Sequence, residues 1–138
     1  MAAALFMSDT NIASCVIRGT PIQLRRRLLD TPLARQCISV ITQAELLFGV
    51  ARKPGAFKLA GLVDEFLLRV RILPWSSNAA LAYAELRTSL ERRGVSLGNM
   101  DMLIAAHARA EGAVLVSNDQ ALRRLEPFVT VEDWTEAA

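Results

Sequence analysis

The sequence predicts an α/β fold with a mainly parallel central sheet. Short runs of aliphatic and β-branched residues alternate along the chain with segments whose apolar residues recur every three or four positions. That alternation is typical of a parallel sheet covered by helices. The chain has 138 residues and contains no internal repeat or linker-like stretch, so we expect a single domain over residues 1–138.

The individual elements follow from local signals. Strands are predicted at 5–7, 36–41, 72–75, 113–116 and 128–131. Thr20 and Pro21 are typical of a helix start, with threonine as the cap and proline in the first helical position. Further helices are predicted from 42 through 50, at 57–70, at 78–92, at 101–111, and as a short helix beginning at 117–119.

The composition excludes several classes of protein. With 52% hydrophobic and 22% charged residues the chain is too apolar to be disordered. It has no apolar run near the ~18 residues that a membrane-spanning helix needs. Cys15 and Cys37 match neither a metal-binding nor a redox spacing, so we expect reduced thiols in a cytoplasmic protein.

Charge is unevenly distributed along the chain. Residues 1–60 carry eight Lys and Arg against three acids, whereas residues 61–138 carry eight against eleven. A basic first half is compatible with a polyanionic partner. With a net charge of only +2, this signal by itself indicates little.

Four acidic residues occupy similar places in the predicted topology. Asp9 and Asp119 follow predicted strands, Glu45 comes one helical turn after the second strand, and Asp101 opens a helix after the loop at Gly98. In an open parallel sheet the carboxyl ends of the strands and the starts of the following helices lie along one edge. The sequence therefore predicts that these four carboxylates converge.

A converging set of carboxylates indicates a divalent cation. The acids would raise one another's pKa unless a cation lay between them. Because the donors are all oxygen, Mg²⁺ or Mn²⁺ is favoured over Zn²⁺. Such an ion activates water and neutralises charge on a phosphate, which are the two requirements of phosphodiester hydrolysis.

Each acid also has a plainer interpretation. Glu45 lies three residues after Thr42 and could complete a capping box. Asp101 could cap its helix or complement the helix dipole. Asp9 and Asp119 could be turn formers. The sequence alone leaves these alternatives open for each residue taken singly.

Several stretches match one family in order along nearly the whole chain. They are 8–11 (SDTN), 38–46 (ISVITQAEL), 72–75 (ILPW), 98–108 (GNMDMLIAAHA) and 114–119 (VLVSND). With these stretches the chain resembles the PIN-domain ribonucleases, specifically the VapC toxins of toxin–antitoxin pairs. The resemblance implies a three-layer α/β/α fold and an endoribonuclease that needs Mg²⁺ or Mn²⁺. It also implies structured RNA such as tRNA as the substrate.

The same resemblance implies partners and site residues. A VapB-like antitoxin would neutralise the toxin, a homodimer and larger complexes would form, and DNA would be bound only through the antitoxin. The catalytic and metal-binding acids would be Asp9, Glu45, Asp101 and Asp119, supported through hydrogen bonds by Asn11 and Ser117. The chain departs from the pattern in having Ser76 where relatives often carry an acid, and Ser117 where threonine is more usual.

The remaining functional candidates are basic or aromatic-ring residues. Contacts to RNA phosphates are expected from among Arg25, Arg52, Lys53 and Lys58. His107 lies six residues after Asp101, about 240° around a helix, so a packed histidine is favoured over a general base.

Two other classes of protein share some of these features. A receiver-like Mg²⁺-binding signalling domain needs a lysine after a late strand, and the only lysines are Lys53 and Lys58. A catalytically weak PIN-fold binding module could lose its metal ligands, yet all four acids are present. Both alternatives are therefore disfavoured.

Overall fold

A five-stranded sheet forms the centre of the molecule in the computed structural model, which describes residues 4–19 and 21–136. The strands are β1 (Phe6–Ser8), β2 (Gln36–Ser39), β3 (Arg71–Leu73), β4 (Val114–Val116) and β5 (Val131–Glu132). Their order is β3-β2-β1-β4-β5, and every pairing is parallel. The predicted α/β fold with a parallel sheet is confirmed.

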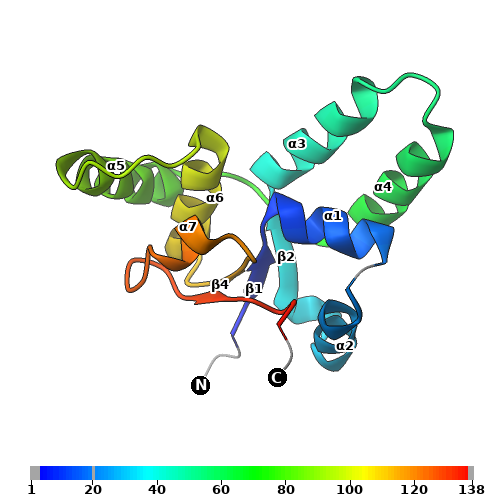
Figure 1. Cartoon of the computed structure of the whole chain (residues 1–138), viewed down its shortest axis with the longest axis horizontal. Helices are drawn as coiled ribbons and strands as arrows, with labels where there is room; N and C mark the ends of the chain where they lie inside the picture. The colour runs from blue at the N-terminus through cyan, green and yellow to red at the C-terminus, as the bar shows by residue number, and fades with distance from the viewer. Residues whose placement is uncertain (1–3, 20, 137–138) are drawn as a thin grey trace.

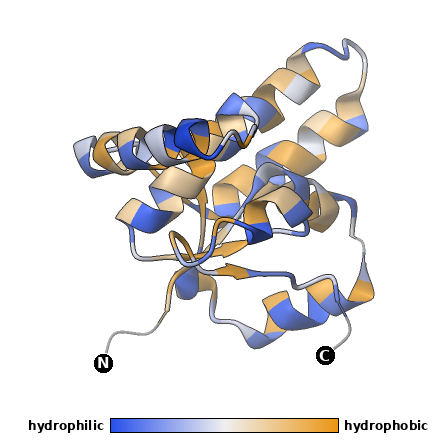
Figure 2. Ribbon diagram, turned by 60° about the vertical axis from the view of Figure 1, so that its left-hand side comes forward, coloured by the Kyte–Doolittle hydropathy of each residue, from blue (hydrophilic) through white to orange (hydrophobic). Residues whose placement is uncertain are grey.

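Helices fill the connections between the strands (Figure 1). They are α1 (Thr10–Arg18), α2 (Ile22–Asp30), α3 (Val40–Ala51), α4 (Phe57–Arg69), α5 (Ser77–Arg92), α6 (Asn99–Ala110) and the short α7 (Gln120–Arg123). Most carry both hydrophilic and hydrophobic residues, whereas the strands are mainly hydrophobic (Figure 2). None of the described helices is both long and apolar enough to cross a membrane.

The sheet separates two layers of helices, as a three-layer fold requires. On one side, α5 and α6 pack their buried side chains against Met7 and Leu115. On the other, α1 and α2 pack Ile12 and Leu24 against Val116. Helices α3 and α4 form a pair that projects beyond the sheet beside α1 (Figure 1) and shares a small core with Ala13 of α1.

Helix α1 was missed by the sequence prediction, which treated residues 8–11 only as a polar strand end. The Asp9 side chain caps this helix by accepting a hydrogen bond from the Ile12 amide at 2.8 Å. Ile12 and Ala13 are buried, and Gly19 ends the helix with a φ of 81°. The helix is therefore short, with a cap at one end and a left-handed glycine at the other.

The end of β2 also differs from the prediction. The strand ends at Ser39 rather than at residue 41, because the Ser39 hydroxyl accepts a hydrogen bond from the Ile41 amide and caps α3. β-branched residues Val40 and Ile41 favoured a longer strand. Since the cap is Ser39, Thr42 lies inside the helix, and the capping box between Thr42 and Glu45 was wrong.

Smaller corrections concern two other boundaries. Helix α2 begins at Ile22 with Pro21 as its cap residue, so Pro21 is not the first helical residue as predicted. The predicted cap, Thr20, lies outside the described residues. The last strand is Val131–Glu132 instead of 128–131.

Candidate active site

The strand order reverses at the centre of the sheet, and the four acids lie around that point. From β1 the chain proceeds outward through β2 and β3, then returns to place β4 on the other side of β1. Asp9 follows β1, and its amide donates to the carbonyl of Val116, the last residue of β4, at 3.0 Å. In open parallel sheets a crevice forms at such a switch point, beyond the carboxyl ends of the strands.

Asp9 is the most buried of the four acids, with 3% of its surface exposed. Burial raises the pKa of Asp9 to about 6, hydrogen bonds from Ser117 and the Ile12 amide lower it, and the charges of Asp101 and Asp119 raise it further. Asp9 also caps α1, a role that differs from the turn former considered for it from the sequence. The cap and the position in the acidic cluster are compatible.

Asp101 approaches the same point from α6. It is the third residue of that helix and is half-buried, and Gly98 is the cap residue. The pKa of Asp101 is raised, first by burial and then by the charges of Asp119 and Glu45. A capping role for Asp101 is thus not observed, although its place in the first turn suits the positive end of the helix dipole.

Asp119 caps α7 and is tied to Asp9 through a shared hydroxyl. Its carboxylate accepts a hydrogen bond from the Ala121 amide at 2.8 Å. Its own amide donates to the Ser117 Oγ at 3.0 Å, while the fully buried Ser117 side chain also bonds to Asp9. Ser117 therefore lies beside both acids.

Glu45 is held by a residue that sequence reasoning did not single out. The Thr10 hydroxyl donates to Glu45 Oε1 at 2.6 Å and lies 3.2 Å from the hydroxyl of the buried Thr42. Thr10 is the first residue of α1, directly after Asp9. Its place next to Asp9 in the sequence was the only signal that Thr10 could contact a metal-binding acid.

Asn11 lies at the edge of the cluster. Its side-chain amide donates to Asn118 Oδ1 at 2.7 Å, an exposed contact that joins the start of α1 to the loop after β4. Through this hydrogen bond, Asn11 joins the segment that carries Asp9 to the segment that carries Asp119. It shows no hydrogen bond from Asn11 to either carboxylate.

The four carboxylates affect one another without forming a closed ligand set. Charge effects connect Asp9, Asp101 and Asp119, and they also connect Asp101 with Glu45. Across residues 4–19 and 21–136, however, no three acidic, histidine or cysteine side chains are close enough together to hold a metal ion as they stand. The arrangement is a loose acidic cluster, with Asp9 deepest.

Comparison with known proteins assigns the family. The model of a family described as PIN domain matches residues 6–126. The chain belongs to the PIN-domain family. Ribonuclease VapC2 of Rickettsia felis is 37% identical over 133 residues, covering 94% of this chain and 98% of the relative. The tRNA(fMet)-specific endonuclease VapC of Salmonella typhimurium is 36% identical over 132 residues, covering 94% and 97%.

Solved structures give the same result. The DNA-bound VapBC complex of Salmonella typhimurium contains a chain with a TM-score of 0.86 and 33% identity, covering 96% of this chain and 99% of that one. VapBC2 of Rickettsia felis, bound to a promoter DNA fragment, contains one with a TM-score of 0.85 and 35% identity, covering 94% and 98%. This PIN domain is therefore of the VapC type.

His107 lies in the interior of the PIN domain. It is fully buried, and its Nδ1 lies 2.7 Å from the Ser39 Oγ. The same oxygen accepts from the Ile41 amide, so Ser39 joins the histidine ring to the first turn of α3. The pKa of His107 is lowered by burial, so the ring is a neutral link between α6 and the start of α3.

The four basic residues proposed to contact RNA line no single cavity of the PIN domain. Arg52 and Lys53 line a cavity that also contains Glu45. Arg25 lines a different cavity, beside Gly19, and Lys58 lines neither. Arg18, which sequence reasoning did not select, lies on the wall of the cavity that contains Glu45.

Proposed function

We propose that this PIN domain is a Mg²⁺-dependent endoribonuclease, the toxin of a toxin–antitoxin pair, with Asp9, Glu45, Asp101 and Asp119 as its metal-holding acids. The observation that carries the proposal is the burial of Asp9 at the switch point with its pKa raised to about 6, in a site where Asp101 and Asp119 add like charge. Burial of a carboxylate among like charges costs stability, and a bound divalent cation would offset that cost.

The donor chemistry fits Mg²⁺, with Mn²⁺ as a substitute. All four side chains offer carboxylate oxygens, which both ions prefer. The hydrogen bonds to Asp119 and Glu45 reach Oδ1 and Oε1 respectively, and within the described residues no hydrogen bond reaches the second oxygen of either. Those oxygens remain available to an ion. Asp9 and Asp101 complete the set that would hold it.

When bound, Mg²⁺ supplies an activated water and neutralises charge on the phosphate. The chain's own residues prepare the place for both. The Ile12 amide and the Ser117 hydroxyl fix the orientation of Asp9, and Thr10 fixes that of Glu45. The amino-terminal ends of α1 and α6 add partial positive charge near the incoming phosphate. Attack by water leaves 5′-phosphate and 3′-hydroxyl ends.

The relatives support a proposed substrate and partner. The Salmonella typhimurium relative is named for cleavage of tRNA(fMet), which supports structured RNA such as tRNA as the substrate here. The similar solved structures are VapBC complexes, two of them bound to DNA. We therefore infer that a small VapB-like antitoxin neutralises this chain in a complex built on a toxin homodimer. DNA contacts would be made through the antitoxin.

Removal of the divalent ion provides the test. Purified protein free of antitoxin is expected to cleave tRNA in Mg²⁺, to stop in excess EDTA, and to resume when Mg²⁺ or Mn²⁺ is restored, as followed on denaturing gels. An Asp64→Asn variant should respond to EDTA and to restored metal as the unmodified protein does, because Asp64 is an exposed acid on α4 outside the cluster. Cleavage that continues unchanged in EDTA would contradict metal dependence.

A further inference from the structure

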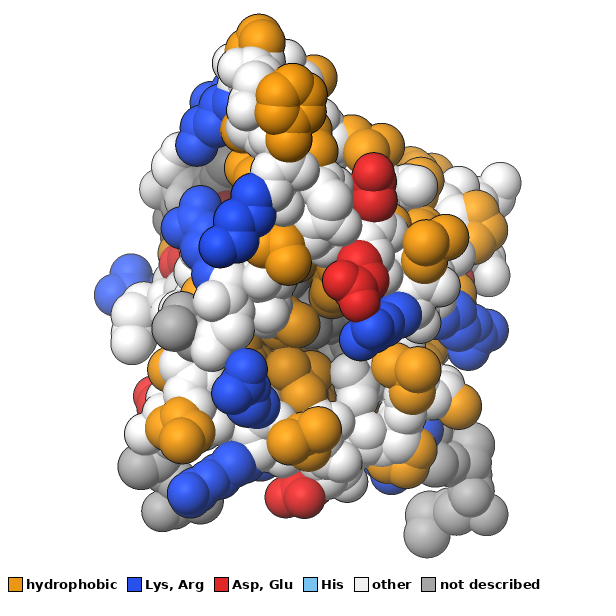
Figure 3. Space-filling view, turned by 90° about the vertical axis from the view of Figure 1, so that its right-hand side faces the viewer, with side chains coloured by type: hydrophobic (Ala, Val, Ile, Leu, Met, Phe, Trp, Pro, Cys, Tyr) orange, Lys and Arg blue, Asp and Glu red, His pale blue; other side chains and the backbone are white. Residues whose placement is uncertain are grey.

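A cavity of about 360 Å³ begins beside the acidic cluster and extends between α1, α3 and α4. Thr10 and Glu45 lie in its wall, and its rim carries Arg18, Arg52 and Lys53. We call this cavity the basic groove. Figure 3 faces the side of the molecule formed by α3 and α4 and shows Lys and Arg side chains gathered at the upper left of that face.

Both α1 and α3, which border the basic groove, lead from the acidic cluster toward its cations. On α1, Thr10, Ser14 and Arg18 follow one another at intervals of four residues. On α3, Glu45 is followed by Gly49, and Arg52 and Lys53 come directly after Ala51, the last residue of the helix. Residues at such spacing share a helix face. At 1.5 Å per residue, Arg18 lies about 12 Å along α1 from Thr10, and the end of α3 that precedes Arg52 and Lys53 lies about 9 Å from Glu45.

The cations of the basic groove are not neutralised by the protein. Elsewhere, Arg27, Arg69, Arg87 and Arg123 each form an ion pair with a glutamate. No ion pair in the described part of the chain involves Arg18, Arg52 or Lys53, and Arg52 only lies over the Phe48 ring at 5.6 Å. Three uncompensated positive charges therefore face a cavity whose only acid is Glu45.

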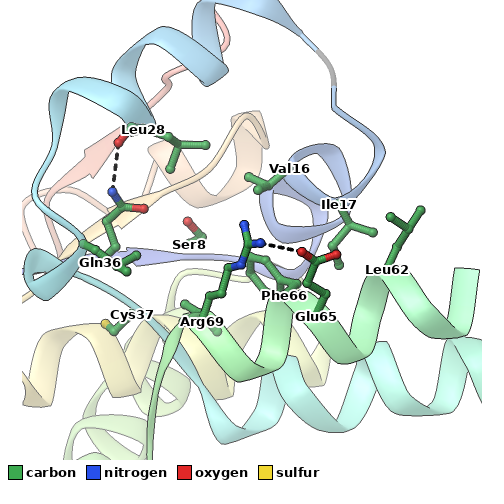
Figure 4. Close-up of a pocket in the computed structure, with 12 residues that line it drawn as sticks. Ser8, Val16, Ile17, Leu28, Gln36, Cys37, Leu62, Glu65, Phe66 and Arg69 are labelled. Carbon is green, nitrogen blue, oxygen red and sulfur yellow. Dashed lines mark hydrogen bonds and ion pairs between the residues drawn. The ribbon is translucent and has the colours of Figure 1, made fainter.

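A second cavity has a mainly apolar lining and provides a comparison for the basic groove. It lies between α1, α2 and α4, and Val16, Leu28 and Phe66 are among its lining residues. Its two charged residues, Glu65 and Arg69, pair with each other (Figure 4). Its charge is balanced internally, whereas that of the basic groove is not. The basic groove is thus the better match for a polyanion.

We propose that the basic groove binds the RNA backbone next to the scissile bond, with Arg18, Arg52 and Lys53 contacting phosphates. The inference rests on the proposed ribonuclease function, because it takes the acidic cluster as the place of the scissile phosphate. An RNA strand that leaves the acidic cluster between α1 and α3 would pass the hydroxyls of Thr10 and Ser14. It would then reach the cations about two helical turns away. Each cation would release counterions from the RNA.

Salt dependence of RNA binding provides the test. Full-length Asp101→Asn protein, which should not cleave, is titrated into a fluorescently labelled single-stranded RNA oligonucleotide of mixed sequence at several KCl concentrations. Adding Arg18→Gln or Lys53→Gln is expected to lower the slope of log Kd against log salt by about 0.7 each, and the pair by about 1.4. Arg92→Gln is the control, because Arg92 is an exposed arginine on α5, outside the groove.

A steric variant tests the same surface without changing charge. Gly49 lines the basic groove, and a Cβ atom built on it meets nothing within 4 Å. Gly49→Leu should therefore leave the fold intact and improve helix propensity. Its side chain would occupy the groove and weaken RNA binding, while the unfolding midpoint in urea stays equal to or above that of the parent protein.

The outcomes separate this inference from the proposed function. Cleavage of tRNA by the unmodified protein tests the function, and the salt slopes test the groove independently of cleavage. Unchanged slopes in Arg18→Gln and Lys53→Gln would overturn the inference even if the enzyme is active. It would also be overturned if these variants kept full RNA binding but escaped inhibition by the antitoxin, since the groove would then belong to a protein partner.

Discussion

An Asp9→Asn variant is expected to lose RNA cleavage and, in the absence of divalent ions, to be more stable than the wild type. The Asp9 side chain is 3% exposed, and its pKa is raised to about 6, chiefly by burial. At neutral pH the folded protein therefore holds an ionised carboxylate in an unfavourable place. Asparagine keeps an oxygen that can accept from the Ile12 amide but carries no charge.

The pH dependence of this effect has a definite sign. Because the folded carboxyl has a higher pKa than the ordinary aspartate value of 3.8, the folded chain binds the proton more tightly than the unfolded chain. The free energy of unfolding of the metal-free wild type should therefore fall as pH rises through the interval from about 4 to about 6. The loss from Asp9 amounts to about 2 to 3 kcal/mol.

Urea denaturation in EDTA, at a pH below this interval and at one above it, measures the difference. The wild type should lose more stability than Asp9→Asn between the two conditions, and Mg²⁺ should restore part of the loss at the higher pH. Asp64→Asn, an exposed acid on α4, should behave as the wild type does. An Asp9→Asn protein less stable than the wild type at both pH values would argue against a destabilising charge at this position.

A Ser39→Ala variant is expected to destabilise the fold by about 2 to 3 kcal/mol. The hydroxyl is fully buried and serves two partners, the Ile41 amide at 3.0 Å and His107 Nδ1 at 2.7 Å. Its removal costs the cap of α3 and leaves a buried ring nitrogen unsatisfied. Since α3 carries Glu45 and α6 carries Asp101, cleavage should fall as well.

Ser76→Ala is the matched control for this prediction. Ser76 also caps a helix, accepting from the Ala79 amide at 3.2 Å, but it is only half-buried and has no second partner of this kind. Its loss should cost about 1 kcal/mol. Equal urea midpoints for the two variants would show that the Ser39–His107 hydrogen bond contributes nothing. A Ser39→Ala/His107→Leu double variant should regain part of the loss, because both buried polar partners are then absent.

The convergence of the acids could be predicted because it depends on topology alone. Once residues 6–8 and 114–116 are taken as neighbouring parallel strands, Asp9 and Asp119 must follow the same edge of the sheet. Asp101 belongs to the same group because its helix leads into β4. None of these inferences needs an exact helix boundary, so errors of one or two residues did not affect them.

Other features could not be predicted because they depend on packing between helices. The hydrogen bond from Thr10 to Glu45 spans 35 residues and exists only because α1 lies against α3. Helix α1 itself is nine residues long, with a pattern too short to stand out from its surroundings. Without α1, the alignment of Arg18 with Arg52 along one groove had no sequence signal.

The rate of tRNA cleavage by Asp101→Asn in Mg²⁺ tests the central claim most directly. That claim is that carboxylates from separate parts of the chain act as one metal-dependent site. Asp101 is half-buried and does not cap its helix, so the substitution should leave the fold unchanged in a urea titration. The account predicts a fall in rate on the order of a hundredfold or more. Cleavage at the wild-type rate by a fully folded Asp101→Asn protein would contradict it.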